Sequence, residues 1–175
     1  MAEVKKPQPV ELFIGAILSD EGLIGPLEAE LKAHFGEIEV RSPVFDFGDT
    51  TYYEDEMGPD LRRVFFAFKD LIDPAGIVDA KLAANDLEGD FVREGRRTVN
   101  LDPGYMDFYK VVLASNKFLG QKIYLGKGVY ADPTLYYDKG WKPYDWGFPD
   151  FKSGRYDAFL TQVRKAYKLK IRNPG

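Results

Sequence analysis

Cysteine is absent from this sequence of 175 residues. Without a thiol, the chain cannot supply a cysteine nucleophile, a disulfide, a thiolate zinc site or an iron–sulfur cluster. Histidine is almost as scarce, because His34 is the only one, so a single chain cannot provide the set of imidazoles that many catalytic zinc sites use. These absences exclude several classes of enzyme.

The sequence also lacks a surplus of positive charge, since 24 basic residues face 28 acidic ones and the net charge is −4. Binding to nucleic acid through its phosphates relies on such a surplus, so general nucleic-acid binding is disfavoured. No apolar run approaches the roughly 20 residues that a membrane-spanning helix needs, and the opening residues contain no apolar leader segment. We therefore expect a cytoplasmic protein without a membrane association.

Hydrophobic residues make up 45% of the sequence, which is enough to bury the core of one domain. We expect residues 1–175 to form a single domain. Its expected parts are a loose arm over residues 1–9, a core over residues 10–105, an antiparallel β extension over residues 106–150 and a terminal helix over residues 153–170 that is capped by Ser153.

Strand and helix patterns alternate along the first 105 residues. Short apolar or alternating runs predict strands, and apolar residues repeated every three or four positions predict helices. The order strand, helix, strand, strand, helix, strand is that of the split βαβ or ferredoxin-like arrangement, so the predicted class is α+β. The predicted strands cover residues 10–18, 37–47, 62–70 and 96–102, and the predicted helices lie within residues 19–36 and 72–91.

Glycine and proline divide the expected β extension into short strands. Pro133 predicts a bulge or an edge position, because proline cannot donate to a strand ladder. Gly126 and Gly128 lack the third glycine and the following helix of a dinucleotide loop, and they predict a hairpin turn instead.

An acidic, tyrosine-rich stretch occupies residues 46–58. Carboxylates gathered in this way can bind a hard cation such as magnesium, and Asp46 and Glu56 are the expected ligands. The regular spacing of a calcium-binding loop is missing. An acidic, solvated connection between two strands explains the same residues, so both interpretations stay open.

The second predicted helix carries a polar stripe beside its apolar face. Lys81, Asn85 and Glu88 are spaced i, i+4 and i+7, which places them on one side of the helix. A lysine and an amide in this position can hold a phosphate or a carboxylate. An ordinary ion pair between Lys81 and either Glu88 or Glu54 is the alternative.

Asp102-Pro103-Gly104-Tyr105 predicts a type II turn, because proline suits its second position and glycine its third. Asn100 lies two residues before Asp102, so both side chains point to the same face at the end of a strand. Such a pair can bind a ligand or cap a neighbouring segment, and the sequence does not decide between these roles.

The sequence resembles a family of bacterial and archaeal proteins of about this length that is described as a domain of unknown function. Residues 99–117 are the most specific part of the resemblance, and some members carry an automatic GTP-binding label, although this chain has no Walker-type loop. The segments that carry the resemblance are PVELFIGAILSD, FDFGDTTYYEDEMG, LIDPAGIVDAKLAANDLE, RRTVNLDPGYMDFYKVVLASNK, KIYLGKGVYADPTLYY and WGFPDFKS.

The resemblance also implies a shared polar pattern. Members tend to have a His-Arg pair just before IYLG, whereas this chain has Gln121 and Lys122 there, which leaves any chemistry of that histidine in doubt here. By position, the pattern falls on Asp46, Tyr52, Tyr53, Glu56, Gly58, Lys81, Asn85, Asn100, Asp102, Gly104, Lys117, Gly126, Gly128 and Tyr130.

We therefore expect a protein that binds a phosphate-bearing or otherwise anionic metabolite, of which a nucleotide with magnesium is one case. Phosphoryl transfer or hydrolysis would then rest on positioning and electrostatics, because no residue can be assigned as a nucleophile. The expected ligand-binding residues are Lys81, Asn85, Asn100, Asp102, Lys117, Tyr52 and Tyr130, and the expected metal ligands are Asp46 and Glu56.

A non-catalytic module that binds protein or RNA is the alternative. Residues 135–151 are rich in tyrosine and tryptophan, which are enriched at binding hot spots, although a buried meander would use them equally. The basic residues near the end of the chain could contact an acidic partner or simply form a solvated face. They are Arg164, Lys165, Lys168, Lys170 and Arg172.

Overall fold

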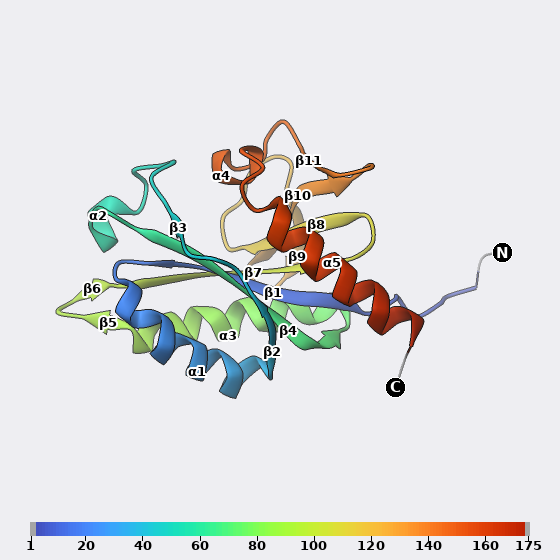
Figure 1. Ribbon diagram of the computed structural model, residues 1–175, viewed down its shortest axis with the longest axis horizontal. Helices are drawn as coiled ribbons and strands as arrows, with labels where there is room; N and C mark the ends of the chain where they lie inside the picture. Colours follow the sequence, from blue (N-terminus) through green and yellow to red (C-terminus); the bar gives the residue numbers. More distant parts are fainter. Residues whose placement is uncertain (1–2, 174–175) are drawn as a thin grey trace.

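The computed structural model describes residues 3–173, which form an α+β structure around one nine-stranded sheet (Figure 1). Its strands are β1 (Val10–Leu18), β2 (Ile38–Arg41), β3 (Phe45–Asp46), β4 (Arg62–Ile72), β7 (Val99–Met106), β8 (Lys110–Ser115), β9 (Ile123–Gly126), β10 (Val129–Tyr137) and β11 (Trp141–Pro143). A separate hairpin consists of β5 (Val92–Arg93) and β6 (Arg96–Arg97). The helices are α1 (Ile24–Phe35), α2 (Glu54–Met57), α3 (Ile77–Asp90), α4 (Pro149–Lys152) and α5 (Asp157–Arg172), with 3-10 turns at Glu21–Leu23 and Pro74–Gly76.

The strands of the large sheet follow the order β11-β10-β8-β7-β1-β4-β2, with β3 paired to β4 and β9 paired to β10. Every pairing between these strands is antiparallel. The strand β1 lies near the middle of the sheet, and all of its residues are buried. Burial on both faces explains why its sequence is a nearly unbroken apolar run.

Helices cover both faces of the sheet (Figure 1). On one face, Leu27 and Leu31 of α1 and Ala84 of α3 pack against the strands in one core cluster. On the other face, Leu160 and Val163 of α5 belong to a second cluster. The sheet therefore separates two cores, and side chains that alternate along one strand enter different cores.

Most of the elements expected from the sequence are present. The strand β1 covers the residues predicted for it, and α1 has Pro26 in its first turn and ends at Gly36, whose φ is 93°. The carboxylate of Asp73 accepts a hydrogen bond from the backbone N–H of Ala75, as expected of the residue before Pro74. Pro133 lies at a register shift between β8 and β10, which confirms the expected bulge. Strands β9 and β10 pair across Gly126 and Gly128, as expected of a hairpin.

The expected type II turn at residues 102–105 is wrong, because these residues continue β7 in extended conformation. Pro103 pairs with Ile14 of β1, and Gly104 pairs with both Phe13 of β1 and Leu113 of β8. A Cβ on Gly104 would lie 2.6 Å from Phe13 and 2.8 Å from Leu113, so glycine is needed here for close packing and not for a positive φ.

The expected cap of the terminal helix is also wrong. The helix α5 begins at Asp157, whereas Ser153 ends the short α4, where its hydroxyl donates to the carbonyl of Asp150 at 2.6 Å. The apolar face expected of the terminal helix is nevertheless buried against the sheet. Local sequence identified that face but not the short helix in front of it.

The aromatic segment near the end of the sheet divides between core and surface. Trp141 is buried in the second core cluster, and its ring packs edge-on against Tyr137 at 5.2 Å. Tyr136, Trp146 and Phe148 remain exposed. Among residues 3–173, no helix is both long and apolar enough to cross a membrane.

The carboxylate of Glu11 lies fully buried in β1, where Lys170 of α5 contacts it at 2.6 Å. The same ammonium contacts Glu39 at 2.6 Å and donates to the carbonyl of Phe68 at 3.1 Å, so one lysine ties α5 to three strands. Burial dominates over these contacts and raises the pKa of Glu11 to about 7.

We predict a specific pH dependence from Glu11. Because its pKa is higher in the folded chain than the ordinary 4.5, its contribution to the free energy of unfolding falls as pH rises from about 4.5 to about 7, by about 3 kcal/mol. This decrease in stability with rising pH should be absent from the Glu11→Gln variant. Its stability relative to the wild type should therefore rise between pH 4.5 and pH 8, as measured by urea denaturation. Glu54→Gln, at an exposed position, is the control, and parallel curves for Glu11→Gln and wild type would contradict the prediction.

Candidate functional site

The ladder between β7 and β8 ends at Gly104. Its paired residues are Gly104 with Leu113, and then Tyr105 and Met106 with the two preceding residues of β8. The pairing of β7 with β1, on the other side, continues back to Val99. Pro103 has no N–H to donate, so the ladder to β8 cannot continue through it. Residues 99–103 of β7 therefore have a strand neighbour on one side only.

Side chains of α3 take the place of the missing strand. The ammonium of Lys81 donates to the carbonyl of Leu101 at 2.8 Å, and the N–H of Leu101 donates to the carboxylate of Glu88 at 2.6 Å. Burial raises the pKa of Glu88, although the hydrogen bond from Leu101 and the charge of Lys81 oppose the increase. The helix thus satisfies both backbone groups at the free edge of β7.

The sequence offered an ion pair between Lys81 and Glu88 or Glu54 as the alternative, but Lys81 binds the backbone of Leu101 instead. The partner of Glu88 is Arg97, at 3.1 Å. Lys81 is only 7% exposed, so water screens its charge little, and this charge favours the ionised forms of nearby Glu88 and Asp102.

Asn100 and Asp102 flank Leu101 and point to the opposite face of the sheet. Asn100 is 6% exposed, and its buried amide nitrogen makes no hydrogen bond of good geometry, although it lies near enough to Asp102 to help lower the pKa of that carboxyl. Burial tends to raise the pKa of Asp102, but the charges of Arg63 and Lys81 outweigh it and hold this pKa below its ordinary value. Asp102 is therefore ionised at neutral pH and can only accept hydrogen bonds.

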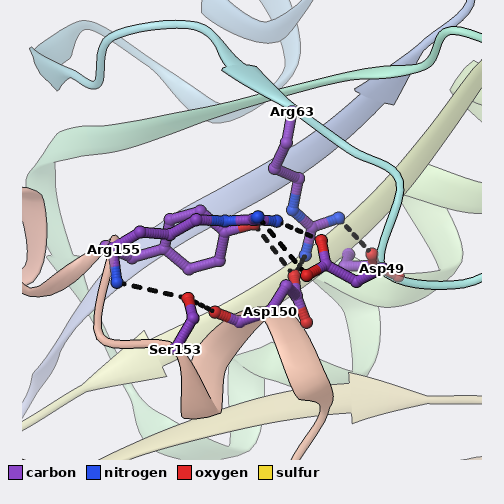
Figure 2. A network of polar contacts seen from close by, with 7 residues as sticks. Asp49, Arg63, Asp150, Ser153 and Arg155 are labelled. Atoms are coloured by element: carbon purple, nitrogen blue, oxygen red, sulfur yellow. Dashed lines mark hydrogen bonds and ion pairs between the residues drawn. The ribbon is translucent and has the colours of Figure 1, made fainter.

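Arg63 of β4 is the central cation on this face (Figure 2). Its guanidinium contacts Asp102 at 2.9 Å and Asp150 of α4 at 3.9 Å, while it is only 3% exposed. Burial alone would lower the pKa of Arg63, but the charges of Asp102 and Asp150 raise it instead. Gly15 makes room for this arrangement, because a Cβ there would lie 2.8 Å from Phe65 and 3.2 Å from the guanidinium.

A second arginine extends the network to the loop before α2 (Figure 2). Arg155 forms an ion pair with Asp49 and donates to the hydroxyl of Tyr156 at 3.0 Å. That hydroxyl in turn donates to Asp150 at 3.0 Å. The connection between α4 and α5 is therefore fixed to the loop that contains Tyr52 and Tyr53.

Two tyrosines of this loop approach the edge of β7 and the segment after β8. The ring of Tyr53 packs edge-on against Tyr52 at 5.0 Å, and burial together with the charge of Asp102 raises the pKa of Tyr53. The hydroxyl of Tyr52 contacts the ammonium of Lys117, which also lies 3.8 Å from the centre of the Tyr52 ring. Because its pKa is raised, Tyr53 keeps a neutral hydroxyl at neutral pH.

Lys117 belongs to the exposed segment that follows β8. Burial and the charge of Lys122 lower the pKa of Lys117. Within residues 3–173, no carboxylate lies within 4.0 Å of its ammonium. The preceding residue, Asn116, accepts a hydrogen bond from the amide of Asn85 at 2.9 Å, which joins this segment to α3.

These contacts define what we call the β7 edge site. A continuous path leads from α3 to β7, to the loop before α2, and on to the segment after β8. The site comprises Lys81, Asn85, Asn100, Asp102, Tyr52, Tyr53 and Lys117. Six of its residues were expected from the sequence as ligand-binding residues, and their binding role stays a prediction.

Tyr130 lies at the side of this site. It pairs with Ser115, whose hydroxyl accepts a hydrogen bond from the N–H of Lys117 at 3.1 Å. Its ring packs against Tyr124 at 5.1 Å and Phe118 at 5.8 Å, and these two neighbours are exposed. Tyr130 therefore contributes to an aromatic surface next to Lys117.

Asp46 and Glu56, the expected metal ligands, contact different arginines. Arg62 approaches Asp46 at 3.2 Å, and Arg97 approaches Glu56 at 2.6 Å. Within residues 3–173, no three histidine or acidic side chains gather into a group that could hold a metal ion. The magnesium role of these two carboxylates stays a prediction.

Sequence reasoning missed the role of Arg63 and Asp150. Their contacts join β4 to β7 and α4, and these segments are far apart along the chain. One signal was available in the sequence, since Arg63 precedes the apolar run VFFAF and Gly15 interrupts the apolar run of β1. A charged residue and a glycine inside buried strands both indicate a close approach of chains.

Comparison with known proteins identifies a family for most of the chain. The family described as "Domain of unknown function (DUF4416)" matches residues 8–167 of the 175 residues, which confirms the resemblance found in the sequence. The match includes every residue of the β7 edge site. Searches of curated proteins and of solved structures gave no match.

We predict that Arg63→Met lowers the free energy of unfolding by about 3–5 kcal/mol, because it leaves half-buried Asp102 and buried Asp150 without their cation. Arg62→Met is the matched control on the same strand. Its side chain is 31% exposed, and breaking its surface ion pairs should cost about 0–1 kcal/mol. Urea denaturation at pH 7 measures both losses, and equal losses would contradict the central position of Arg63.

Proposed function

Because the chain belongs to the family described as "Domain of unknown function (DUF4416)", we propose a function from its own side chains. The protein binds a small phosphate-bearing or otherwise anionic metabolite at the β7 edge site. The observation that carries this assignment is a pair of donors that the described chain leaves for a ligand. They are the buried amide of Asn100, which makes no hydrogen bond of good geometry, and the ammonium of Lys117, which has no acidic partner within the described residues.

The amide of Asn100 favours a ligand because the neighbouring carboxylate of Asp102 is not placed to accept a hydrogen bond of good geometry from it. A buried N–H group without a partner costs about 1–3 kcal/mol, and such groups are uncommon in native structures. An oxygen of a phosphate or carboxylate would satisfy this group. Lys81 brings positive charge to the same part of β7, where its partner is a backbone carbonyl, whereas the charge of Arg63 is already matched by Asp102 and Asp150.

Lys117 supplies the charge at the exposed side of the site. Burial and nearby Lys122 lower its pKa, so an anion beside the ammonium would relieve the repulsion between the two lysines. The hydroxyl of Tyr52 already contacts this ammonium and can share in binding. A charge-assisted hydrogen bond of this kind is stronger than a neutral one.

A nucleotide is one ligand of this class. Tyr130, Tyr124 and Phe118 offer aromatic faces beside Lys117, on which a base could stack. Magnesium would arrive with the phosphates, and Asp46 and Glu56 are the carboxylates predicted to contact it. Catalysis by phosphoryl transfer or hydrolysis would depend on electrostatic positioning by the lysines.

We also propose that β1, α1, β2, β4, α3 and β7 form a ferredoxin-like split βαβ core. The order β7-β1-β4-β2, the antiparallel pairing of these strands and the packing of α1 and α3 in one core cluster support this assignment. The strands β8 to β11 extend the same sheet, which supports one domain over the whole described chain.

A non-catalytic interaction module is the second candidate, and exposed aromatic residues favour it. The rings of Tyr144 and Trp146 stack at 4.8 Å, and Tyr136 packs on Tyr144 at 5.2 Å. Trp146 is 48% exposed. The basic residues of α5 support this candidate less, because Lys170 and Arg164 are occupied by contacts within the chain.

We predict that a phosphate-bearing metabolite raises the melting temperature of the protein. At 100 times its dissociation constant, a ligand should add about 2.7 kcal/mol of stability, or about 5–10 °C for a chain of this size. Thermal-shift assays with nucleotides, sugar phosphates and carboxylates, each with and without magnesium, measure this effect.

Two lysine variants test whether the ligand found in the thermal-shift assay binds at the β7 edge site. Lys117→Gln should weaken binding about tenfold or more, because it removes a charge-assisted contact of about 1.5–3 kcal/mol. Lys127→Gln is the matched control, since Lys127 is exposed and pairs with Asp79. No shift with any ligand, or equal shifts for both variants, would contradict binding at the β7 edge site and favour the interaction module.

We predict a second and opposite effect at Asn100. Asn100→Leu should raise the free energy of unfolding of the ligand-free protein by about 1 kcal/mol, because an apolar side chain of similar shape replaces an unpaired buried amide. The same variant should lose the ligand-induced thermal shift. A clear loss of stability in Asn100→Leu would show that the amide already has a partner in the free protein.

A further inference from the structure

A cavity of about 290 Å³ lies away from the β7 edge site, at the other end of β7. Aromatic side chains dominate its walls, and they come from the end of β7, from the turn that follows it and from α5. They are Tyr105, Phe108, Tyr109 and Tyr167. Asp107 lies among them, and Pro7 and Pro74 complete the apolar part of the lining.

Backbone hydrogen bonds fix the turn that presents these rings. The carboxylate of Asp107 accepts from the N–H of Tyr109 at 2.8 Å and from the N–H of Lys110 at 2.9 Å. The carbonyl of Tyr109 accepts from the N–H of Tyr137 at 2.8 Å. The carbonyl of Phe108 accepts from Arg164 of α5 at 3.0 Å. The aromatic walls are therefore held in place before any ligand arrives.

Tyr167 is fully buried, whereas Tyr105 and Phe108 are half-buried and Tyr109 is exposed, so three of the four rings keep accessible surface. Phe108 packs against buried Tyr167 at 4.8 Å, which forms the deep wall. Tyr109 stands at the outer wall with 72% of its surface exposed, although its backbone is fixed on both sides. A large aromatic ring that is left in solvent on a fixed backbone makes little contribution to stability. Exposed aromatic residues of this kind are common at binding sites.

We propose that this cavity binds a small molecule with an alkylated ammonium group, such as a trimethylammonium head group. Several aromatic faces around one cavity attract a cation through their quadrupoles, and such cages are a known way to recognise quaternary ammonium groups. The methyl groups of the ligand match the apolar walls. The ammonium of Lys110 does not oppose this, because it is bound to Asp107.

The charged groups around the cavity are balanced. Asp107 is paired with Lys110, and Glu11 is paired with Lys170, so the attraction for a cation comes from the aromatic rings. The site is independent of the proposed anion site, since the two share no residue.

Choline and its neutral isostere, in which a tert-butyl group replaces the trimethylammonium group, test this assignment by isothermal titration calorimetry with the whole chain. Choline should bind in a saturable way, and the isostere should bind at least about tenfold more weakly, because cation–π attraction needs the charge. Tyr109→Leu should weaken choline binding about tenfold. Its fold should be intact, since the ring is exposed.

Two control variants keep the outcome specific. Tyr136→Leu changes another exposed tyrosine outside the cavity, and Lys117→Gln changes the anion site, so both should bind choline as the wild type does. Absence of saturable choline binding, equal binding of the isostere, or unchanged binding by Tyr109→Leu would each overturn the proposal. None of these outcomes bears on the anion site, which is tested separately by phosphate compounds.

Discussion

Pro103 determines how the two halves of the sheet meet. The backbone N–H and carbonyl of Leu101 point away from β1, toward side chains of α3. Because backbone groups of a strand alternate with a period of two residues, the nitrogen of Pro103 lies on that same side. Proline has no hydrogen to donate there, so β8 separates from β7 beyond Gly104. Lys81 and Glu88 fill the space along β7. Burying their charges is costly, and their hydrogen bonds to the free backbone groups of Leu101 offset this cost. The polar character of the site thus follows from one missing donor.

Alternating residues of β7 connect the two cores on opposite faces of the sheet. Leu101 faces the core that contains α1 and α3, whereas Asp102 points toward Arg63 and the core beneath α5. Arg63 holds Asp102 ionised, and the ionised carboxylate together with Arg63 fixes the strand between the two cores. The amide of Asn100 lies on the same face, where it makes no hydrogen bond of good geometry. A rigid strand that holds an unsatisfied donor is the kind of preorganised arrangement that a binding site requires.

Local patterns were sufficient for elements with uniform burial, which covers both faces of β1 and one face of α3. They failed at Pro103 and Gly104, because turn preferences are local while the conformation of these residues is decided by pairing with β1 and by close contact with Phe13 and Leu113. The spacing of Asn100 and Asp102 did indicate a shared face. Their partner Arg63 could not be found from spacing, since the contact joins strands that are 39 residues apart. Long-range electrostatic partners need the tertiary fold, which composition and periodicity do not specify.

The most direct measurement follows the side-chain amide of Asn100 by two-dimensional NMR while the phosphate compound that gives the largest thermal shift is added. If an anion binds at the β7 edge site, the two amide proton signals of Asn100 should move on binding, because the group gains a well-aligned hydrogen-bond acceptor. The signals of Asn173, at the far end of α5, should stay in place. Stationary Asn100 signals at saturating ligand would contradict the central claim, even if the ligand bound elsewhere on the protein.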